Sequence, residues 1–530
     1  MFGELLVIGI VIIGFLFYKL STENARYFEE RNLKYRGVFH FFKNISTLIS
    51  GQYDGFQSGQ NMYNFFSDER IFGAFDFNIR QYVVRDPEVY KLLAIKDFDH
   101  FCDHRVIISE EIDELFGNSL ISMHGEKWRQ MRATLSPAFT GSKMRLMFEL
   151  VSECADGIVE HFMKQAENKQ KINIEMKDFF SRYANDVIAT CAFGIKVNSF
   201  AEPNNDFFQT AKKMMRFGGF IQMFKILVHF LLPQVAKLLN LQFSDRKLSM
   251  EFKNIILDTM AMRKRNNIHR PDMVNMLMQV RDGHLEQKIE EKSNEIQEGF
   301  ATVEESNVGK ANVTRKWSDS ELVAQCFLFF IAGFETSSAL LTFAAYEIMV
   351  NADVQQKLYE EISEVNEQLG GKRITYDALQ KIKYLDQVIS ETLRKYPTAI
   401  QTDRTCVKDY VYDDGERKFT IEKGSNVIFS LIGVHRDSKY YQDPEKFNPD
   451  RFNDENKHNV LPSAYVPFGV GPRNCIGSRF ALMEAKAILY NLLLNFSFEP
   501  NKDTKIPIKL KKTFFIVFDG VHLELKPRAK

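Results

Sequence analysis

A long apolar run in the interior of this 530-residue chain places the strongest limit on its fold. Residues 322–346 contain one charged residue, Glu335, and a helix of 25 residues is long enough to cross a bilayer. An ionised carboxyl near the bilayer centre would cost roughly 3 kcal/mol, and only the N-terminal segment of the chain is comparably apolar. We therefore predict a helix that crosses a protein interior and begins at a capping box formed by Ser318 to Glu321.

Two small residues, Ala332 and Gly333, lie in the middle of this predicted helix. The missing side-chain bulk would let a flat ligand approach the helix backbone. Glu335 and Thr336 follow within one turn and can pass protons at such a site. The alternative interpretation is a buried carboxyl held by local hydrogen bonds.

Composition excludes several classes of protein. Lys plus Arg and Asp plus Glu both number 69, so the chain lacks the basic excess with which proteins bind nucleic acid phosphates. Apolar residues at 45% and charged residues at 26% are ordinary for a globular protein and exclude a long disordered chain. The 48 phenylalanines indicate an aromatic interior and favour a pocket for an apolar ligand.

Residues 1–20 are predicted to form a membrane anchor, because Glu4 is the only charged residue among the first 18. A cleaved signal peptide is the alternative, but it would carry a basic residue before the apolar run and small residues at its end. By the positive-inside rule, the remainder of the chain is expected in the cytosol. The basic residues that favour this topology follow the run at Lys19, Arg26, Arg31, Lys34 and Arg36.

The rest of the chain shows no internal repeat and one long polar interruption, residues 281–318, which we interpret as a surface connection that is at least partly mobile. Apolar spacings of three and four predict helices, whereas short alternating runs predict strands. The pattern indicates a mainly α fold with small β-sheets. Helical patterns occur at 115–139, 354–369 and 478–496, and strand patterns at 77–86, 418–430 and 513–525.

The six cysteines include no CxxC pair, which argues against a disulfide framework or a zinc module. Cys475 differs from the others because it follows a turn rich in glycine and proline and immediately precedes a predicted helix. Backbone N–H groups, a helix N-terminus and Arg473 would all favour a thiolate there, and a thiolate is a metal ligand or a nucleophile. The alternative is a small buried residue without chemistry.

Residues 468–477 carry the whole pattern F-x-x-G-x-R-x-C-x-G, and at this point the chain resembles the cytochromes P-450, the haem-thiolate monooxygenases. The resemblance implies a membrane anchor at 1–20, a linker of uncertain course at 21–60 and a single haem domain at 61–530. It implies that Cys475 is the axial thiolate ligand of haem b iron, and that Phe468 and Arg473 in the same loop contact the cofactor.

Further motifs extend this resemblance. Residues 332–337, AGFETS, resemble the oxygen-activation motif, which implies that Ala332 and Gly333 line the oxygen site and that Glu335 and Thr336 deliver protons. Two other sets occur in the order that the family shows. Trp128, Arg132, Arg404 and Arg473 match positions that hold the haem propionates, and Glu391, Arg394 and Arg451 match a structural Glu-Arg-Arg triad.

The resemblance implies that the protein inserts one oxygen atom from O2 into lipophilic substrates. Electrons would come from NADPH through NADPH-cytochrome reductase, and cytochrome b5 is a further candidate partner. The motif style is similar to that of insect microsomal members, which implies xenobiotic metabolism at the endoplasmic reticulum membrane, with the catalytic domain on the cytosolic side.

Three alternatives stay open at this point. A reductase-independent isomerase or dehydratase of the same superfamily would keep the haem but would not need Glu335 and Thr336 for proton delivery. A non-enzymatic haem-thiolate sensor would need only Cys475, as the haem ligand. A membrane transporter would use the two apolar segments as spans.

Overall fold

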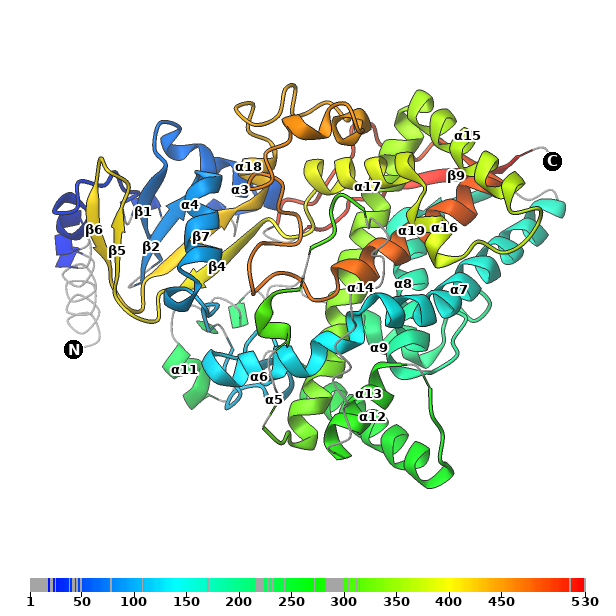
Figure 1. Cartoon of the computed structure of the whole chain (residues 1–530), viewed down its shortest axis with the longest axis horizontal. Coiled ribbons are helices and arrows are strands. Elements are labelled where there is room, and N and C mark those ends of the chain that lie inside the picture. Colours follow the sequence, from blue (N-terminus) through cyan, green and yellow to red (C-terminus); the bar gives the residue numbers. More distant parts are fainter. Residues whose placement is uncertain are drawn as a thin grey trace, which may run out of the picture.

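The structure, a computed structural model, combines a large helical part with smaller sheets (Figure 1). The sheet containing β1, β2, β4 and β7 lies at one end of the molecule, and the helices dominate the other end. These features confirm the predicted fold class. The structure describes residues 18–528 apart from 20, 21, 24, 38, 41, 42, 44, 45, 48, 49, 77, 78, 107, 169, 170, 215–223, 226, 227, 230–232, 240, 243, 271, 283–298, 304, 311, 312, 314, 514 and 515.

The helices follow in chain order. The α-helices are α3 (Gly55–Tyr63), α4 (Pro87–Lys91), α5 (Glu114–Gly117), α6 (Gly125–Leu135), α7 (Gly141–Glu167), α8 (Met176–Phe193), α9 (Asp206–Met214), α11 (Pro233–Leu238), α12 (Arg246–Asn266), α13 (Met273–Asp282), α14 (Asp319–Val350), α15 (Ala352–Gln368), α16 (Tyr376–Gln380), α17 (Lys383–Lys395), α18 (Leu431–His435) and α19 (Ser478–Asn495). Shorter helical turns are η1 (Asn64–Phe66), η2 (Leu92–Lys96), η3 (Phe98–His100), η4 (Ser136–Phe139), η5 (Asn307–Lys310), η6 (Pro449–Phe452) and η7 (Lys457–Asn459).

Three sheets are present among the described residues. The largest has the strand order β1-β2-β7-β4, in which only the β2 and β7 pair is parallel. A three-stranded antiparallel sheet has the order β3-β9-β8, and β5 and β6 form a hairpin. The strands are β1 (Ile71–Asp76), β2 (Ile79–Val84), β3 (Ile172–Glu175), β4 (Gln401–Thr405), β5 (Tyr410–Asp413), β6 (Lys418–Ile421), β7 (Asn426–Ser430), β8 (Phe496–Glu499) and β9 (His522–Pro527).

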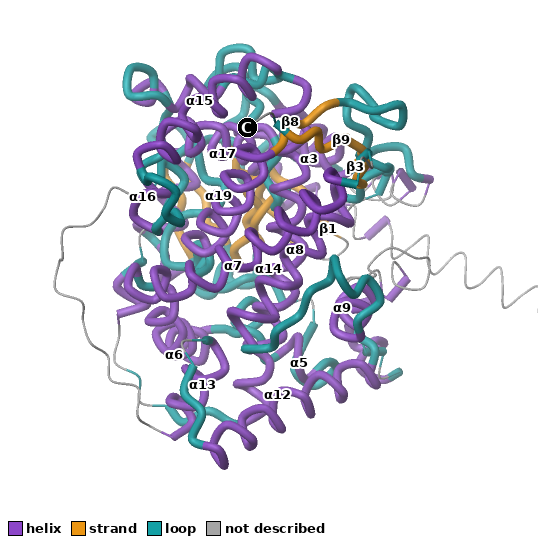
Figure 2. Tube along the Cα trace, turned by 90° about the vertical axis from the view of Figure 1, so that its right-hand side faces the viewer, coloured by secondary structure: helices purple, strands orange, loops and turns teal. Residues whose placement is uncertain are grey.

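Helix α14 runs through the centre of the molecule, and α7, α8, α17 and α19 surround it (Figure 2). The predicted capping box is present, since Ser318 Oγ accepts from the Glu321 N–H and the Glu321 carboxylate accepts from the Ser318 N–H. Among the described residues, α14 is the one helix long and apolar enough to cross a membrane, yet 61% of its most apolar window is buried inside the protein. Its place as an interior helix is therefore as predicted.

The other helical patterns are confirmed with one interruption. Residues 354–368 belong to α15 and residues 478–495 to α19, but 115–139 is divided into α5, α6 and η4. The break between α5 and α6 brings Met123 beside Arg473, because the Met123 carbonyl accepts a hydrogen bond of 2.8 Å from Arg473 Nη2. A continuous helix could not present this carbonyl sideways, since its own later N–H groups would use it.

The strand patterns are confirmed in part. The first run contains β2, and the second divides at its glycine into β6 and β7. Among the described residues of the third run, only the second half, after Gly520, forms a strand, β9. The first half instead makes an isolated bridge between Leu510 and Phe518.

The predicted anchor, residues 1–20, lies almost wholly outside the described residues. Part of the predicted linker, 21–60, packs on the largest sheet. The Tyr27 and Tyr82 hydroxyls are 2.8 Å apart, and the side chains of Phe28 and Leu33 are buried. This segment therefore extends the hydrophobic core of the sheet end instead of running free of it.

The polar connection predicted at 281–318 has two parts. Residues 283–298 lie outside the described residues. Residues 299–303 and 305–310, which we call the docked segment, pack against the protein, with Ala301 buried and η5 in contact with α6. This second part is still a surface connection, since most of its residues are half-buried, but Phe300, Ala301 and Val308 attach it to the core.

Candidate active site

The loop that carries Cys475 is closed by a hydrogen bond of 2.8 Å from the Cys475 N–H to the Phe468 carbonyl. Gly469 and Gly471 both have φ of +74°, in the left-handed region that favours glycine. A Cβ atom on Gly471 would lie 2.1 Å from the Ala94 carbonyl oxygen, so no larger residue fits there. Gly469 and Gly471 are thus required by the path of the chain around the cysteine.

Cys475 is exposed, whereas the other five cysteines, all within the described residues, are buried or half-buried. Burial nevertheless raises the pKa of the Cys475 thiol, which means that protein surrounds it on most sides. The Gly477 N–H and the charge of Arg132 act in the opposite direction and lower this pKa. The thiol is therefore accessible, and Gly477 and Arg132 partly offset the effect of burial in favour of the thiolate.

Helix α14 presents a second accessible surface inside the molecule. Ala332 and Thr336, one turn apart, are exposed, although Phe334 and Ser337 beside them are buried. The Thr336 hydroxyl donates to the Ala332 carbonyl at 2.6 Å. Gly333 has another role in addition to the predicted one, because a Cβ there would lie 2.8 Å from Ile188 Cδ1 of α8. Its missing side chain allows α8 and α14 to approach closely.

Glu335 forms an ion pair with Lys177 of α8, with 2.9 Å between Lys177 Nζ and Glu335 Oε1. The same ammonium donates to Ser338 Oγ at 2.5 Å. The Glu335 side chain is 39% exposed, so it is not the isolated buried carboxyl of the alternative interpretation. Sequence analysis missed Lys177, which is 158 residues away in the chain and carries no motif.

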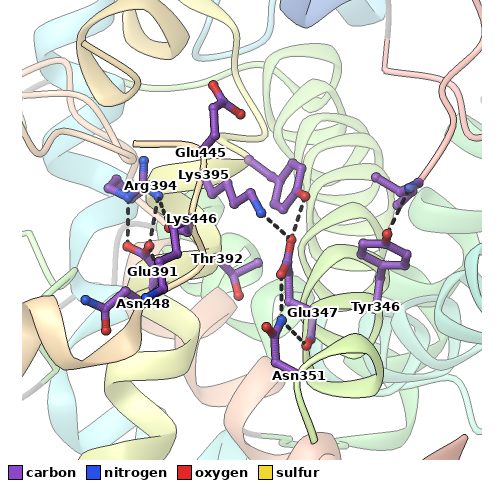
Figure 3. A network of polar contacts seen from close by, with 12 residues as sticks. Tyr346, Glu347, Asn351, Glu391, Thr392, Arg394, Lys395, Glu445, Lys446 and Asn448 are labelled. Carbon is purple, nitrogen blue, oxygen red and sulfur yellow. Dashed lines mark hydrogen bonds and ion pairs between the residues drawn. The ribbon is translucent and has the colours of Figure 1, made fainter. Parts of the chain in front are cut away.

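The predicted Glu-Arg-Arg triad comes together. Glu391 and Arg394 of α17 are fully buried and share two hydrogen bonds of 2.7 and 2.8 Å (Figure 3). Arg451 of η6 lies 3.3 Å from Glu391 Oε1, and the Asn448 N–H donates to the same oxygen at 2.9 Å. Arg394 also donates to the His435 carbonyl at 2.9 Å. The triad therefore joins three separate segments around one buried carboxylate.

Arg473 extends from the Cys475 loop over the indole of Trp128, at 3.9 Å from the ring centroid. It donates to Asp103 Oδ1 at 3.0 Å and to the Cys102 carbonyl at 2.7 Å. Burial, with the nearby charge of Arg404, lowers the pKa of Arg473 to about 9, so the guanidinium stays protonated at neutral pH. Trp128 and Arg473 are thus brought together as predicted.

Arg404, on β4, is 1% exposed, and its Nε is a buried donor without a partner among the described residues. Its Nη1 donates to the Asp403 carbonyl at 2.6 Å. Nearby His104 donates from Nδ1 to Asp403 Oδ1 at 3.1 Å, and burial lowers the pKa of His104 to about 4, so this imidazole is neutral. Two buried guanidiniums, one with an unused N–H, fit a group that brings its own negative charge.

Haem needs an axial ligand, an open face and cations for its carboxylates. These needs are met here by Cys475, by the accessible face of α14 and by the guanidiniums of Arg404 and Arg473. Comparison with known proteins then identifies the chain. A family model described as "Cytochrome P450" matches residues 48–525. The chain belongs to the cytochrome P450 family.

Similar curated proteins are insect P450s. "Probable cytochrome P450 9f2" of Drosophila melanogaster is 43% identical over 502 residues, which cover 93% of each chain. "Cytochrome P450 9e2" of Blattella germanica is 43% identical over 526 residues, 97% of this chain and 96% of the relative. "Cytochrome P450 6j1" of the same organism is 32% identical over 530 residues, 99% and 98% of the two chains.

Family membership confirms several predictions from the sequence. Members of the family bind haem through a cysteine thiolate and are oxidoreductases, so this P450 is a haem-thiolate monooxygenase. The family also implies redox partners and lipophilic substrates. The isomerase, sensor and transporter interpretations gain no support from these comparisons.

The structure of this P450 places Arg132 differently from the expectation of a propionate clamp. Its Nη1 and Nη2 donate to the Asn474 carbonyl and to Asn474 Oδ1, each at 2.8 Å. Its Nε and Nη2 donate to the Glu305 carboxylate at 3.2 and 2.7 Å. Because these four bonds use four of the five N–H groups of a guanidinium, at most one is left for a ligand.

The alternation Asp99 to His104 resembles a metal cluster in sequence, but no group of three or more ligating side chains suited to a metal ion occurs among the described residues of this P450. Asp99 instead pairs with Arg129 at 2.7 Å, and Asp103 pairs with Arg473 at 3.0 Å. These acids position basic side chains near the Cys475 loop.

Proposed function

We propose that this P450 holds haem b through Cys475 and oxidises lipophilic small molecules, xenobiotics among them, at the endoplasmic reticulum membrane. The observation that carries the proposal is the accessible thiol of Cys475, held in a glycine loop deep in the protein. The bound haem supplies the O2 and electron chemistry. The chain's own residues hold it, move protons and exclude water.

Trp128 and Arg404 would donate to the haem carboxylates. Arg473 would act on them mainly through its charge, since four of its five N–H groups already bond to Asp103 and to the carbonyls of Cys102, Leu120 and Met123. The unpartnered Nε of Arg404 is the donor best placed to gain a hydrogen bond, because a buried N–H without a partner costs roughly 1–3 kcal/mol. Arg473 is already fixed by Asp103 and the Trp128 ring, so it contributes a rigid positive charge. Phe468 contributes packing within the cysteine loop.

Protons would reach the site along Lys177, Glu335 and Thr336. The Lys177 ammonium and the Glu335 carboxylate are in contact at 2.9 Å, and Glu335 is partly open to solvent. Thr336 is exposed, as is Ala332 one turn earlier on the same helix. A hydroxyl donor next to a solvent-connected acid is suited to deliver protons. The triad of Glu391, Arg394 and Arg451 has a structural role in this proposal.

Apolar substrates suit the aromatic surroundings of α14. Phe330 contacts Phe207 at 5.6 Å and Phe252 at 5.8 Å between ring centroids, and Phe208 lies 6.4 Å from Phe334. Such rings bury large apolar area. Xenobiotic substrates are proposed from the likeness to insect P450s and not from any one contact.

The membrane and partner assignments belong to the same proposal. Residues 1–20 would anchor the protein, with the catalytic domain on the cytosolic side and electrons delivered by NADPH-cytochrome reductase and by cytochrome b5. Leu238 at the end of α11 is 84% exposed and Leu239 is 61% exposed, so this helix end offers apolar side chains to a membrane surface.

Reduced-plus-CO spectroscopy of the purified protein tests the assignment of Cys475. The wild-type protein should show the thiolate-type Soret band of the family, and Cys475→Ala should abolish it. Cys406→Ala, which changes a buried cysteine that bonds to the Lys408 carbonyl, is the control and should keep the band. A Cys475→Ala protein that retains the thiolate-type band would disprove the assignment.

A further inference from the structure

The docked segment is held tightly at its first residues. The Phe300 N–H donates to Asp386 Oδ2 at 2.8 Å, and Asp386 forms an ion pair of 2.8 Å with the fully buried Lys486 of α19. A Cβ on Gly299 would lie 1.8 Å from Asp386 Oδ1, so the backbone itself lies against this carboxylate. The start of the segment is therefore fixed to the helix that follows Cys475.

Aromatic packing and close contact fix the rest of the segment. The Phe300 ring lies 4.9 Å from that of Phe452 and 5.3 Å from that of Tyr465, between ring centroids. A Cβ on Gly309 would lie 2.6 Å from Ser136 Oγ. Because both ends approach the protein this closely, a side chain between them has a defined position.

Glu305 is that side chain. Its carboxylate receives the forked pair of hydrogen bonds from Arg132, with the shorter one 2.7 Å long. The Arg132 side chain is 3% exposed and Glu305 is 22% exposed, so solvent screens this pair only weakly. The charge of Arg132 is thus balanced mainly by Glu305.

Arg132 connects Glu305 to the cysteine loop. The opposite side of its guanidinium holds both the carbonyl and the side-chain oxygen of Asn474, the residue that directly precedes Cys475. A planar guanidinium that is fixed on both edges cannot rotate without breaking two charge-assisted bonds. Movement of Glu305 is therefore transmitted to the backbone beside the sulfur.

We propose that Glu305 is a positioning residue for the haem ligand, which acts through Arg132 and Asn474 on the geometry and the electrostatic field at Cys475. This inference rests on the proposed role of Cys475. With Glu305 present, Arg132 orients the loop while its charge is largely cancelled. Without it, the buried cation beside the ligand loop loses this ion-pair partner and stabilises any added negative charge there.

Glu305→Gln in the full-length haem-bound protein tests the proposal. The variant keeps the shape of the side chain but removes its charge. Since reduction of the bound haem adds one electron, we expect its reduction potential to shift to more positive values and the thiolate-type fraction of the reduced CO complex to fall. The control is Glu69→Gln, which removes a comparably buried ion pair with Arg417, 2.7 Å long, at the sheet end of the molecule.

A second variant, Glu305→Asp, keeps the charge with a shorter reach. We expect the reduction potential of the haem in this variant to shift in the same direction by a smaller amount. This shift can be measured even where Glu305→Gln fails to fold. A wild-type protein with the thiolate-type band, together with Glu305 variants whose potential and band match those of Glu69→Gln, would overturn the inference and leave the role of Cys475 intact. A wild-type protein without the band would instead disprove the proposed function.

Discussion

At the scale of single residues, Thr336 has the most specific expected role. Thr336 is exposed although Phe334 and Ser337 beside it are buried, and its hydroxyl donates to the Ala332 carbonyl one turn earlier. We expect Thr336→Ala to reduce the product formed per NADPH consumed about a hundredfold, at the lower limit for loss of a positioned proton donor, while NADPH consumption continues. The measurement is the ratio of product to NADPH in a reductase-supported assay.

Thr342→Ala is the matched control for this prediction. Thr342 lies on the same helix and makes the same kind of bond, from its hydroxyl to the Ser338 carbonyl at 2.6 Å, but it is fully buried. Its loss should alter stability and leave the coupling ratio unchanged. If both variants kept the wild-type ratio, Thr336 would have no part in proton delivery.

The carboxyl of Glu484, on α19, should make the free energy of unfolding depend on pH. Its carboxyl is fully buried, Oε2 accepts from Ser337 at 2.6 Å, and burial raises its pKa to about 8. The folded protein therefore keeps a proton that the unfolded chain releases near the ordinary pKa of 4.5. This contribution to the free energy of unfolding is fully present below pH 4.5 and is lost as the pH rises to about 8.

Glu484→Gln should remove this loss. We expect the variant to gain stability relative to the wild-type protein as the pH rises through that range, by no more than about 5 kcal/mol in total. Denaturant unfolding across the range measures the difference. Ser337→Ala, which deletes the hydrogen bond and keeps the titrating carboxyl, should retain the wild-type slope; equal slopes for Glu484→Gln and the wild type would contradict the assignment.

At the scale of elements, the triad of Glu391, Arg394 and Arg451 joins α17 to η6. Removal of one partner leaves a buried charge without compensation, which costs roughly 3–5 kcal/mol. We expect Glu391→Gln to destabilise the protein by about that amount in denaturant unfolding. Asp450→Asn is the control, since it breaks a half-exposed pair with Lys357, 2.7 Å long, and should cost at most about 1 kcal/mol.

Elements set by local sequence were predictable. The capping box and the unbroken apolar run determine α14, and the glycines at 469 and 471 determine the cysteine loop, because each depends on residues a few positions apart. Contacts that join distant elements were not predictable. Lys177 meets Glu335 across 158 residues, and Arg132 meets Glu305 across 173, so neither pair leaves a local pattern in the sequence.

Arg132 has the position on α6 that the motif predicts, but it makes contacts that the motif does not predict. The spacing of Trp128 and Arg132 places both on one side of α6, and both are buried. The sequence could not show that residues 299–310 return to supply Glu305, because that stretch is polar and lacks helical or strand periodicity. Only the packing of the whole chain shows which acid reaches the guanidinium.

At the scale of the whole molecule, we expect the stability of the haem domain to depend on residues 21–37 and not on residues 1–20. Tyr27, Phe28 and Leu33 are buried against the sheet end, and Arg31 pairs with Glu422 at 2.9 Å. Each buried apolar side chain contributes roughly 1.5–3 kcal/mol. A chain that begins after residue 20 keeps these contacts, whereas one that begins after residue 37 loses them all.

We therefore expect deletion of residues 1–20 to leave the thiolate-type band and the thermal midpoint close to those of the full chain in detergent, and to weaken membrane binding. Deletion of residues 1–37 should lower the midpoint clearly, because it uncovers Tyr82 and the neighbouring strands of the sheet. Phe28→Ala in the full chain separates packing from length and should destabilise by about 3–5 kcal/mol. Equal midpoints for the two deletions would show that the segment packs on the sheet without stabilising it.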